Sequence, residues 1–317
     1  MIGFDIGGTK CAVTIGEEVN GKLVIRDKRK FMTEHDASPY EIIDKMCSLA
    51  EEMTDDFSAI GISCGGPLDS KNGIILSPPN LPGWDEIHIT DYIKKKYNGY
   101  VGLQNDANAC AVAEWKYGAG VGTENMIFLT FGSGLGAGMI LNGKLYTGTN
   151  DMAGEAGHIR LSAFGPVGYG KAGSFEGFCS GNGIASLGRM MATESLQMGK
   201  AVSYCESMSQ LDSITAKSIA DAANAGNHDA IEVYRICGEK LGEGLSVLID
   251  ILNPEMIVIG SVFQRSENLL REAMEEKIKK ETLSYSRSVC RVVPAALTEN
   301  IGDYAALSVA ALGAERK

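Results

Sequence analysis

The sequence predicts an α/β protein built from two related domains. Strand-like apolar runs alternate with amphipathic helical patterns along most of the chain. The chain has 317 residues, 44% of them hydrophobic, which fits about two domains. The segments DIGGTKCAVTIGEEVNGKL and TFGSGLGAGMILNGKL also resemble each other. Each predicts a strand, a glycine turn, a second strand and an Asn-Gly turn. This match favours two related halves, with chance similarity of glycine-rich hairpins as the alternative.

The first half of the chain predicts a sheet with helices between its strands. MIGFDIG and KCAVTIG predict a hairpin around Gly7-Gly8. The further elements expected here are a strand over 21–31, a helix over 38–53, a strand over 58–64, a helix over 91–98, a strand over 100–106 and a helix that follows it to residue 117. The domain boundary is expected near Gly118-Ala119-Gly120, where three small residues interrupt the pattern.

The second half predicts more helix. NMIFLTFG is a buried strand, and a long helical pattern ends at Asn253-Pro254. The elements expected after residue 200 are helices over 218–227, 229–252, 266–281 and 302–315, with strands over 255–261 and 290–297. We therefore expect one domain of residues 1–117 and a second domain of residues 118–300. The family resemblance described below adds the C-terminal helix of about 301–317 to the first domain.

Composition limits the function classes. The net charge of −11 argues against a nucleic-acid surface, which needs clustered Lys and Arg, but not against a small anion held by backbone amides. Eight cysteines occur without a CxxC pair, so we expect buried free thiols in a reducing compartment. The first residues enter a strand directly, and no apolar run reaches about 18 residues. A soluble, cytoplasmic protein without a membrane anchor is expected.

Two glycine-rich turns are candidates for phosphate binding. In the first, Asp5 ends a strand, Gly7 and Gly8 turn the chain, and Thr9 and Lys10 follow. Glycine amides can approach phosphate oxygens closely, and Asp5 can hold Mg²⁺ directly or through water. A plain hairpin turn is the alternative, and the Walker spacing is absent.

The second turn contains Gly132, Ser133 and Gly134 after a buried strand. The helix that would follow in a Rossmann site is not predicted here, which argues against that fold.

Carboxylates and amides mark candidate positions for a polyhydroxyl substrate. Asp106 stands where a strand ends and a helix begins, so it is either a helix N-cap or a base that accepts a proton from a substrate hydroxyl. Asn105 would then bind a neighbouring hydroxyl. In SPPNLPGW, Asn80 and Trp84 either line a polyol pocket or belong to a structural loop.

The ordered motifs DIGGTK, QNDANA, TFGSGLGAG, GEAGH and NPEMIVIG together resemble the ROK family of sugar kinases and sugar-responsive repressors, across nearly the whole chain. The resemblance implies a two-domain actin/hexokinase-like (ribonuclease H-like) α/β fold with an interdomain cleft. The sequence starts at DIGGTK, without the helix-turn-helix of the repressors, so it resembles the kinase branch. A homodimer is what the resemblance further implies.

The resemblance also implies roles for single residues. Asp106 matches the general base that deprotonates the primary hydroxyl of the sugar. The positions that match contacts to the other sugar hydroxyls are Asn105, Glu155, His158 and Glu176. The positions that match the phosphate loops are Gly8, Thr9, Lys10, Gly132, Ser133 and Gly134. Gly260 matches a glycine near the adenosine, and ATP with Mg²⁺ is the implied donor.

One departure from the family concerns zinc. Many ROK proteins follow the histidine with CxCGxxGC, and that histidine and three cysteines bind a structural zinc. Here Val167, Tyr169 and Ser174 stand in place of the thiols, and these are poor zinc ligands. We expect no zinc, and an aromatic cluster of Phe164, Tyr169, Phe175 and Phe178 in place of the metal. His158 is then free to contact a sugar, with a structural histidine as the alternative.

The expected activity is therefore ATP-dependent phosphorylation of a hexose at its primary hydroxyl, with glucose as the first candidate. Fructose, mannose and N-acetylhexosamines stay open as substrates, as do polyphosphate or other nucleotides as donors. A non-catalytic sugar-binding sensor is the rival class, against which Asp106 and both phosphate loops argue. A kinase for a non-sugar polyol or acid fits the two carboxylates and the histidine of residues 155–176 less well.

Overall fold

The computed structural model describes residues 1–34 and 36–314. The chain forms two compact units. Unit 1 contains residues 1–124, 138–153 and the chain from Ala296 onward, and unit 2 contains residues 125–137 and 154–295. The expected domains of 1–117 with 301–317, and of 118–300, stay a prediction. Residues 315–317 of the expected C-terminal helix lie outside the described residues.

Unit 1 is a five-stranded sheet with helices on both faces. The sheet has the order β3-β2-β1-β4-β7, in which β1, β4 and β7 run parallel and β2 and β3 run antiparallel. The elements are β1 (Ile2–Ile6), β2 (Lys10–Val19), β3 (Lys22–Met32), α1 (Pro39–Met53), β4 (Ala59–Cys64), β5 (Leu68–Asp69), β6 (Ile74–Ile75), α2 (Ile89–Lys94), β7 (Tyr100–Asn105), α3 (Asp106–Tyr117), β10 (Lys144–Tyr146), η3 (Thr298–Asn300) and α10 (Ile301–Ala314).

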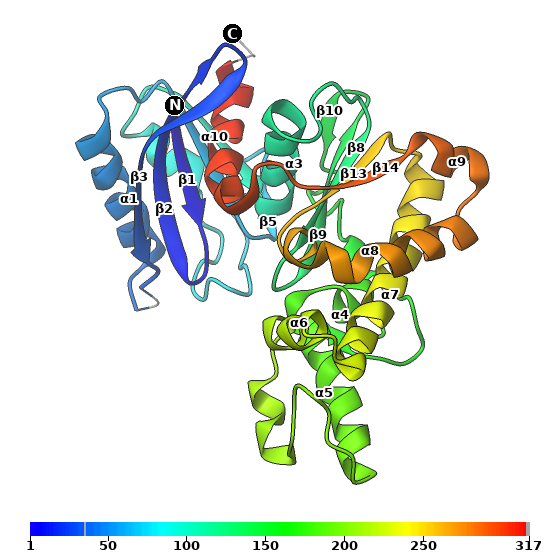
Figure 1. Cartoon of the computed structure of the whole chain (residues 1–317). Helices are drawn as coiled ribbons and strands as arrows, with labels where there is room; N and C mark the ends of the chain where they lie inside the picture. Colours follow the sequence, from blue (N-terminus) through cyan, green and yellow to red (C-terminus); the bar gives the residue numbers. More distant parts are fainter. Residues whose placement is uncertain (35, 315–317) are drawn as a thin grey trace. The chain divides into compact units, whose positions relative to one another are not determined.

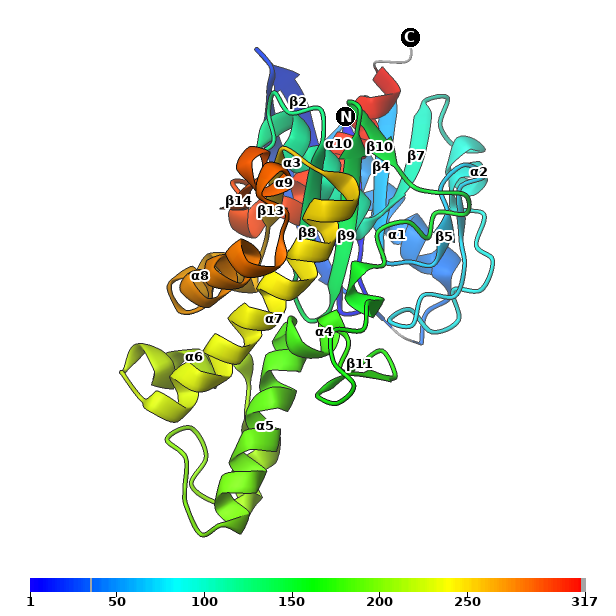
Figure 2. The ribbon, with the colours of Figure 1, turned by 90° about the vertical axis from the view of Figure 1, so that its right-hand side faces the viewer.

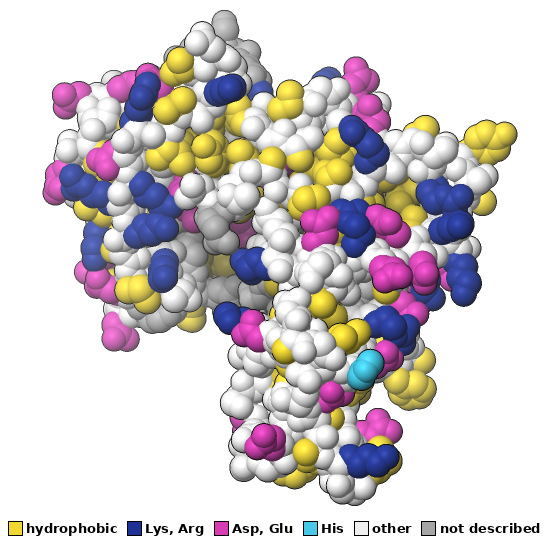
Figure 3. Space-filling model, in the orientation of Figure 1, with side chains coloured by type: hydrophobic (Ala, Val, Ile, Leu, Met, Phe, Trp, Pro, Cys, Tyr) yellow, Lys and Arg dark blue, Asp and Glu magenta, His cyan; other side chains and the backbone are white. Residues whose placement is uncertain are grey.

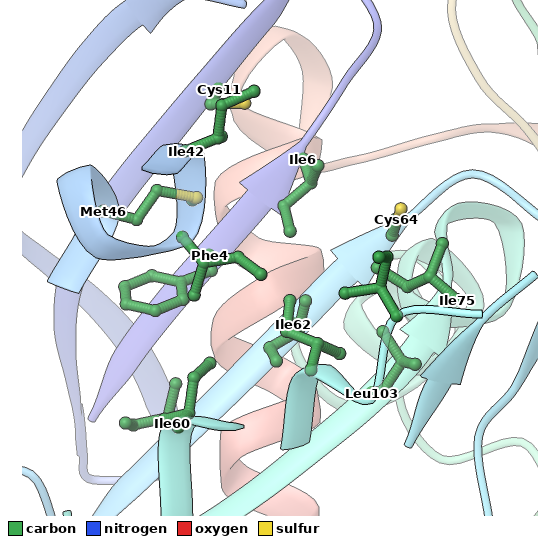
Figure 4. Close-up of a cluster of buried hydrophobic side chains, with 14 of the residues drawn as sticks. Phe4, Ile6, Cys11, Ile42, Met46, Ile60, Ile62, Cys64, Ile75 and Leu103 are labelled. Atoms are coloured by element: carbon green, nitrogen blue, oxygen red, sulfur yellow. The ribbon is translucent and has the colours of Figure 1, made fainter. Parts of the chain in front are cut away.

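Helix α10 covers one face of this sheet, although it lies at the other end of the chain from β1 (Figure 1). Gly61 of β4 allows this close packing. A Cβ atom at Gly61 would lie 2.1 Å from the Ala306 carbonyl oxygen and 2.3 Å from the Ala310 nitrogen. The opposite face carries the main apolar cluster, where Phe4 of β1 lies near Met46 of α1 (Figure 4). The sheet is therefore buried on both sides, as parallel strands require.

A buried carboxylate ties the segment before α10 to the end of α3. Glu114 is fully buried, and its carboxylate accepts hydrogen bonds from the backbone amides of Ala119, Ala296 and Leu297 at 2.7, 3.2 and 2.8 Å. Such charge-assisted bonds offset the cost of burying the charge.

Unit 2 contains most of a mixed sheet and a larger helical part. β9 and β10 of this sheet run antiparallel, and residues 138–141 of β9 and the whole of β10 are assigned to unit 1. The second sheet has the order β10-β9-β8-β13-β14, and the pairs β8–β13 and β13–β14 are parallel. The elements not yet given are β8 (Met126–Phe131), β9 (Leu135–Leu141), η1 (Ala156–His158), β11 (Val167–Gly168), β12 (Lys171–Ala172), α4 (Phe175–Phe178), α5 (Gly181–Gln197), η2 (Met208–Ser213), α6 (Ala216–Asn224), α7 (His228–Leu252), β13 (Met256–Ile259), α8 (Val262–Glu281), α9 (Ser284–Val289) and β14 (Arg291–Pro294).

Several general expectations can be compared with the structure. The predicted buried free thiols are confirmed except at Cys290, which is half-buried. Within the described residues, no helix has the length and apolar character to cross a membrane. On the face shown in Figure 3, basic and acidic side chains are interspersed and form no basic stripe.

Candidate active site

The functional residues of unit 1 gather where its parallel strands end. In the register of β1, β4 and β7, Ile6 pairs with Cys64, and Cys64 pairs with Asn105. The carboxyl ends of all three strands therefore meet at one edge of the sheet. In open parallel sheets, this edge is where ligands bind.

The first glycine turn lies at this edge and contacts the loop that carries Asn80. The amide of Gly7 donates to the carbonyl of Lys10 at 3.1 Å, which closes the turn between β1 and β2. A Cβ atom at Gly8 would lie 2.3 Å from the carbonyl oxygen of Asn80, so only glycine allows this approach. Asn80 and Thr9 are both exposed. The structure thus places Asn80 beside the first candidate phosphate loop.

Asp5 is the carboxylate of this turn. Burial, together with the negative charges of Asp303 and Asp106, raises its pKa to about 6. A cavity of about 240 Å³ beside Asp5 is also lined by Lys10 and Lys30. Asp303 and Lys28 line it too and form an ion pair with each other. Among the described residues, Asp5 is thus the lining carboxylate without an ion pair. One such carboxylate beside cationic side chains fits the usual protein contribution to an Mg²⁺–phosphate site, in which the substrate supplies most other oxygen ligands.

Asn105 and Asp106 occupy the junction between β7 and α3. The N-cap of α3 is Asn105, whose side-chain oxygen accepts a hydrogen bond from the Ala107 amide at 3.0 Å. Asp106 is the first helical residue, and its Oδ1 accepts from the same amide at 2.8 Å. The alternative in which Asp106 serves as the N-cap is therefore wrong. One oxygen of Asp106 is held in place, and the residue stays exposed to solvent at the strand edge.

The electrostatic environment of Asp106 suits proton transfer. Although the residue is exposed, protein surrounds the carboxyl group on enough sides that desolvation raises its pKa. The hydrogen bond from the Ala107 amide opposes this shift. A carboxylate with a raised pKa is a better proton acceptor than an ordinary aspartate.

Trp84 does not belong to the site. Its side chain is 2% exposed and forms part of the apolar core of unit 1, so the idea that it lines a polyol pocket is wrong. The sequence contained no signal that separated a core tryptophan from a pocket tryptophan in this proline-rich loop.

In unit 2, the second glycine turn and Gly260 lie at the ends of neighbouring parallel strands. β8 leads into Gly132–Gly134, and β13 leads into Gly260, whose amide donates to the Leu129 carbonyl at 3.0 Å. The turn itself is closed by a hydrogen bond from the Gly132 amide to the Gly134 carbonyl at 3.1 Å. The candidate phosphate and adenosine positions of this unit therefore share one sheet edge.

The start of helix α5 supports the second turn, and the sequence prediction missed it. The amide of Gly181 donates to the Gly132 carbonyl at 2.7 Å, and the amide of Asn182 lies 3.5 Å from the Ser133 carbonyl. Ser180 is buried and caps the helix by accepting from the Gly183 amide. A serine ahead of this helix was the available signal, but the glycines that follow it obscured the helical pattern.

Glu176 is anchored against the same turn. Its Oε2 accepts a hydrogen bond from the Leu135 amide at 2.9 Å, and a Cβ atom at Gly134 would lie 2.6 Å from this oxygen. Gly157 packs on this pair, since its own Cβ would lie 2.1 Å from the Leu135 carbonyl and 3.2 Å from the Glu176 Cβ. The segment with Glu155 and His158 is thereby brought next to Glu176.

Glu155 and His158 flank the short helix η1. Glu155 precedes it, and its carbonyl accepts from the His158 amide at 3.1 Å. His158 is exposed, and its ring lies 6.4 Å from that of Tyr169 in an edge-to-face arrangement. The structure therefore brings together the two acids and the histidine that the sequence singled out in residues 155–176.

The loop that carries the zinc ligands in many ROK proteins is held here by backbone contacts. The Leu161 amide donates to the Gly173 carbonyl at 2.9 Å, and Gly173 donates to Pro166 at 2.9 Å. Ser174 is buried and caps α4, whereas Val167 is exposed. Within the part of the chain that the structure describes, no three metal-binding side chains gather. The absence of zinc stays a prediction.

The expected aromatic cluster in this loop is only half present. Phe175 and Phe178 are buried, and Phe175 packs against Gly244 of α7. Phe164 and Tyr169 are 84% and 77% exposed, so their predicted packing in place of a metal is wrong. The positive φ of 44° at Tyr169 places this residue at a turn, where its ring points away from the core.

The chain is similar to known proteins in sequence and in fold. The sequence matches the ROK family over residues 1–312. It is 29% identical to a glucokinase of Thermotoga maritima over 312 residues, which covers 98% of this chain and 96% of that protein. A glucokinase of Halalkalibacterium halodurans is 31% identical over 281 residues, or 87% and 84% of the two chains.

Two further similarities bear on function. A xylose repressor of Caldicellulosiruptor bescii is 28% identical over 88% of this chain and 69% of that protein. The solved structure of a ROK family glucokinase from Streptomyces griseus, in complex with glucose and AMPPNP, matches with a TM-score of 0.77 and 28% identity, over 99% of each chain.

Proposed function

Because the chain belongs to the ROK family and is a sugar kinase, we propose that it transfers the γ-phosphoryl group of ATP to the primary hydroxyl of a hexose, glucose first. Its fold is the actin-like fold of these kinases. The glucokinases among its relatives support glucose as the acceptor. The observation that carries the proposal is Asp106, exposed at the end of β7 with one oxygen fixed and a raised pKa.

Asp106 acts as the general base. The Ala107 amide holds Oδ1, and the Asn105 side chain also hydrogen-bonds the carboxyl group. We assign Oδ2 to accept the proton of the attacking hydroxyl. Phosphoryl transfer requires little covalent chemistry from the protein, and it depends on alignment and charge neutralisation. Asp106 is fixed at a strand end, on the first turn of α3, and this position provides the alignment.

Polar side chains are the proposed sugar contacts. We assign Asn80, Asn105, Glu155, His158 and Glu176 to its hydroxyls. Each of these side chains pairs with one sugar hydroxyl. A sugar analogue that lacks this hydroxyl leaves the side chain without a hydrogen-bond partner in the complex, which costs binding free energy. Oε1 of Glu176 is the oxygen assigned to the sugar, since Oε2 is engaged by Leu135.

The donor is bound by the glycine turns. We assign Gly7, Gly8, Thr9 and Lys10, with Gly132, Ser133 and Gly134, to the phosphates, and Gly260 to the adenosine. Asp5 would hold Mg²⁺, and that ion when bound neutralises the charge on the transferring phosphate. The Gly7 and Gly132 amides close their turns and are not themselves the donors to phosphate. The closed turns hold the neighbouring amides in place, so these need no reorganisation when the phosphate charge shifts.

The test is ADP release with Mg-ATP across a panel of hexoses and N-acetylhexosamines, with Asp106→Asn as the blank. Activity on glucose that is lost in the variant supports the proposal. Turnover of another sugar keeps the kinase chemistry and replaces glucose as the substrate. The same assay with polyphosphate in place of ATP identifies the preferred donor.

The xylose repressors among the relatives favour one rival function, a sugar-binding sensor without catalysis. A sensor binds sugar without ATP and releases no ADP. If calorimetry detects sugar binding while no sugar on the panel gives turnover, the sensor replaces the kinase proposal.

A further inference from the structure

A second cavity lies in unit 1, along the outer edge of its sheet. It has a volume of about 670 Å³ and is lined by residues of β7, α2, α3, the hairpin turn before β10, and α10. β7 is the last strand of the sheet, with α2 beside it (Figure 2). The volume lies within the range of sites for small molecules. None of the residues assigned above to the sugar or to ATP lines this cavity.

The lining of this cavity is positively charged. Lys71, Lys94 and Lys144 line it, and no aspartate or glutamate does. Elsewhere, lysines such as Lys45 and Lys217 form ion pairs, whereas these three have no ion pair within the described residues. Asp69 lies close enough to Lys71 to interact with its charge, but it does not line the cavity. In a chain with a net charge of −11, three lysines around a cavity whose lining has no carboxylate favour an anion there.

The three lysines come from separate elements that the fold brings together. Lys71 follows β5, Lys94 ends α2, and Lys144 begins β10. Ser70 donates from its amide and its hydroxyl to the carboxylate of Asp151 at 2.7 and 2.9 Å. These bonds tie the turn with Lys71 to the segment that follows β10, so the cavity has walls on opposite sides.

The remaining lining supplies backbone donors and aromatic surface. Because β7 has no partner strand on this side, its outward backbone groups between Tyr100 and Gln104 face the cavity. The half-buried side chain of Trp115 lines another part, and its Nε1 donates to the Thr123 carbonyl at 2.8 Å. That bond fixes the ring, and Lys116 Nζ lies over it at 5.5 Å from its centroid. The part of the ring that lines the cavity is the aromatic surface available to a ligand.

From this combination, we propose that the cavity is a second ligand site, which binds a small phosphorylated molecule with a ring, such as a sugar phosphate. The lysines bind the phosphate, and the aromatic side chains contact the ring. This site is separate from the catalytic residues and is independent of which hexose the kinase phosphorylates.

The test uses Trp115 as a reporter. The sequence has two tryptophans, and Trp84 is buried in the core, so a ligand in the cavity changes the fluorescence of Trp115 alone. The full chain is titrated with glucose 6-phosphate, and binding is measured in parallel by calorimetry. We expect a saturable fluorescence change, which Trp115→Phe removes while calorimetric binding persists.

Charge variants assign the signal to the cavity. Lys94→Glu combined with Lys144→Glu is expected to weaken the affinity reported by Trp115 at least about tenfold, since close charge pairs dominate such sites. Lys95→Glu is the matched control, because Lys95 is exposed on the same helix end and does not line the cavity. Lys10→Ala should leave the Trp115 signal in place, because it alters only the phosphate loop.

Two results would overturn the proposal. One is the absence of any saturable signal at millimolar glucose 6-phosphate. The other is an equal affinity in the wild type, the double variant and the Lys95→Glu control. Matching thermal unfolding midpoints show that the double variant is folded, so a lost signal cannot be attributed to unfolding. Calorimetric binding that depends on Lys10 alone would place the sugar phosphate at the catalytic site instead.

Discussion

Asp106, the first residue of α3, is subject to two opposing effects on the pKa of its carboxyl group. Desolvation raises the pKa of Asp106, while the Ala107 amide and the positive end of the helix dipole favour the carboxylate. The net shift is upward. The ionised form is therefore less stable in the fold than in water, which is the condition of a group used for proton transfer rather than for stability.

Asp106→Asn is expected to lower kcat by at least about 100-fold, because a general base contributes on that scale or more. The amide keeps the hydrogen bond with Ala107, so sugar binding should largely survive. Steady-state kinetics and calorimetry measure the two effects. A near-wild-type kcat would remove Asp106 as the base.

The pH dependence follows from the sign of the shift. As the pH falls through the raised pKa of Asp106, the base is protonated and kcat falls, with the acidic limb above the usual aspartate value of 3.8.

The same pKa shift has the opposite effect on the free energy of unfolding, which rises as the pH falls. Since the folded pKa lies above the unfolded one, ionisation costs stability at neutral pH, and protonation at lower pH relieves this cost. Asp106→Asn should thus be at least as stable as the wild type at pH 7, measured by denaturant unfolding. A clearly less stable variant would show that the carboxylate stabilises the fold.

Backbone conformation within local sequence motifs could be predicted, whereas burial that depends on distant contacts could not. Asn20-Gly21 and Asn142-Gly143 were predicted as hairpin turns, and all four residues have positive φ, between 52° and 73°. This is a local property of the two residue types. Whether Trp84 meets solvent or the core depends on helices and strands far along the chain, and here the local sequence misled.

At the scale of elements, the contact between α10 and the first sheet depends on glycine. Gly61→Ala is expected to lower the free energy of unfolding by about 3 kcal/mol, because the added methyl group meets the backbone of α10. Gly16→Ala is the matched control. Its Cβ would meet the end of the flexible Leu307 side chain, at 2.5 Å, so a loss of about 1 kcal/mol is expected. Denaturant unfolding measures both, and equal losses would mean that α10 shifts to make room.

The loop of residues 158–178 provides the metal prediction. Because Val167, Tyr169 and Ser174 stand where thiolates would bind, zinc content near zero and an unfolding midpoint unchanged by EDTA are expected. Elemental analysis and thermal unfolding test this. About one zinc per chain would show that other side chains have taken over as ligands.

Helices differed in how well their patterns predicted them. The pattern predicted α7 over 229–252, and the helix spans His228–Leu252. The helix predicted from residue 266 begins earlier, at Val262, and Ser266 is a non-helical position inside it. α5 was missed because its first turn is Gly-Asn-Gly, in which glycine disfavours the helix that capping and tertiary contacts impose.

At the scale of the whole molecule, we propose a homodimer, as expected for the family. Sedimentation equilibrium should then give twice the chain mass of 33.7 kDa at micromolar concentration. The chain mass itself, independent of concentration, would contradict the dimer. The Lys94→Glu and Lys144→Glu variant described above serves as a control for nonspecific charge effects on association.

The assignment of residues to the two units was the least predictable part of the fold. The periodicity of each segment gives helices and strands, but it does not tell which of them pack together. The placement of a C-terminal helix with the N-terminal strands came from the family resemblance. The return of residues 138–153 to unit 1 was not expected from any local pattern.

The position of α10 in the chain order has a consequence for synthesis. The face of the first sheet that bears Gly3 and Gly61 is covered by residues 301–314, which a ribosome translates long after the strands of that sheet. Until then, the nascent chain must carry a completed set of strands with an uncovered apolar face. Chaperones that bind exposed apolar surface should therefore associate with the nascent chain from the synthesis of these strands until residues 301–314 can pack on them.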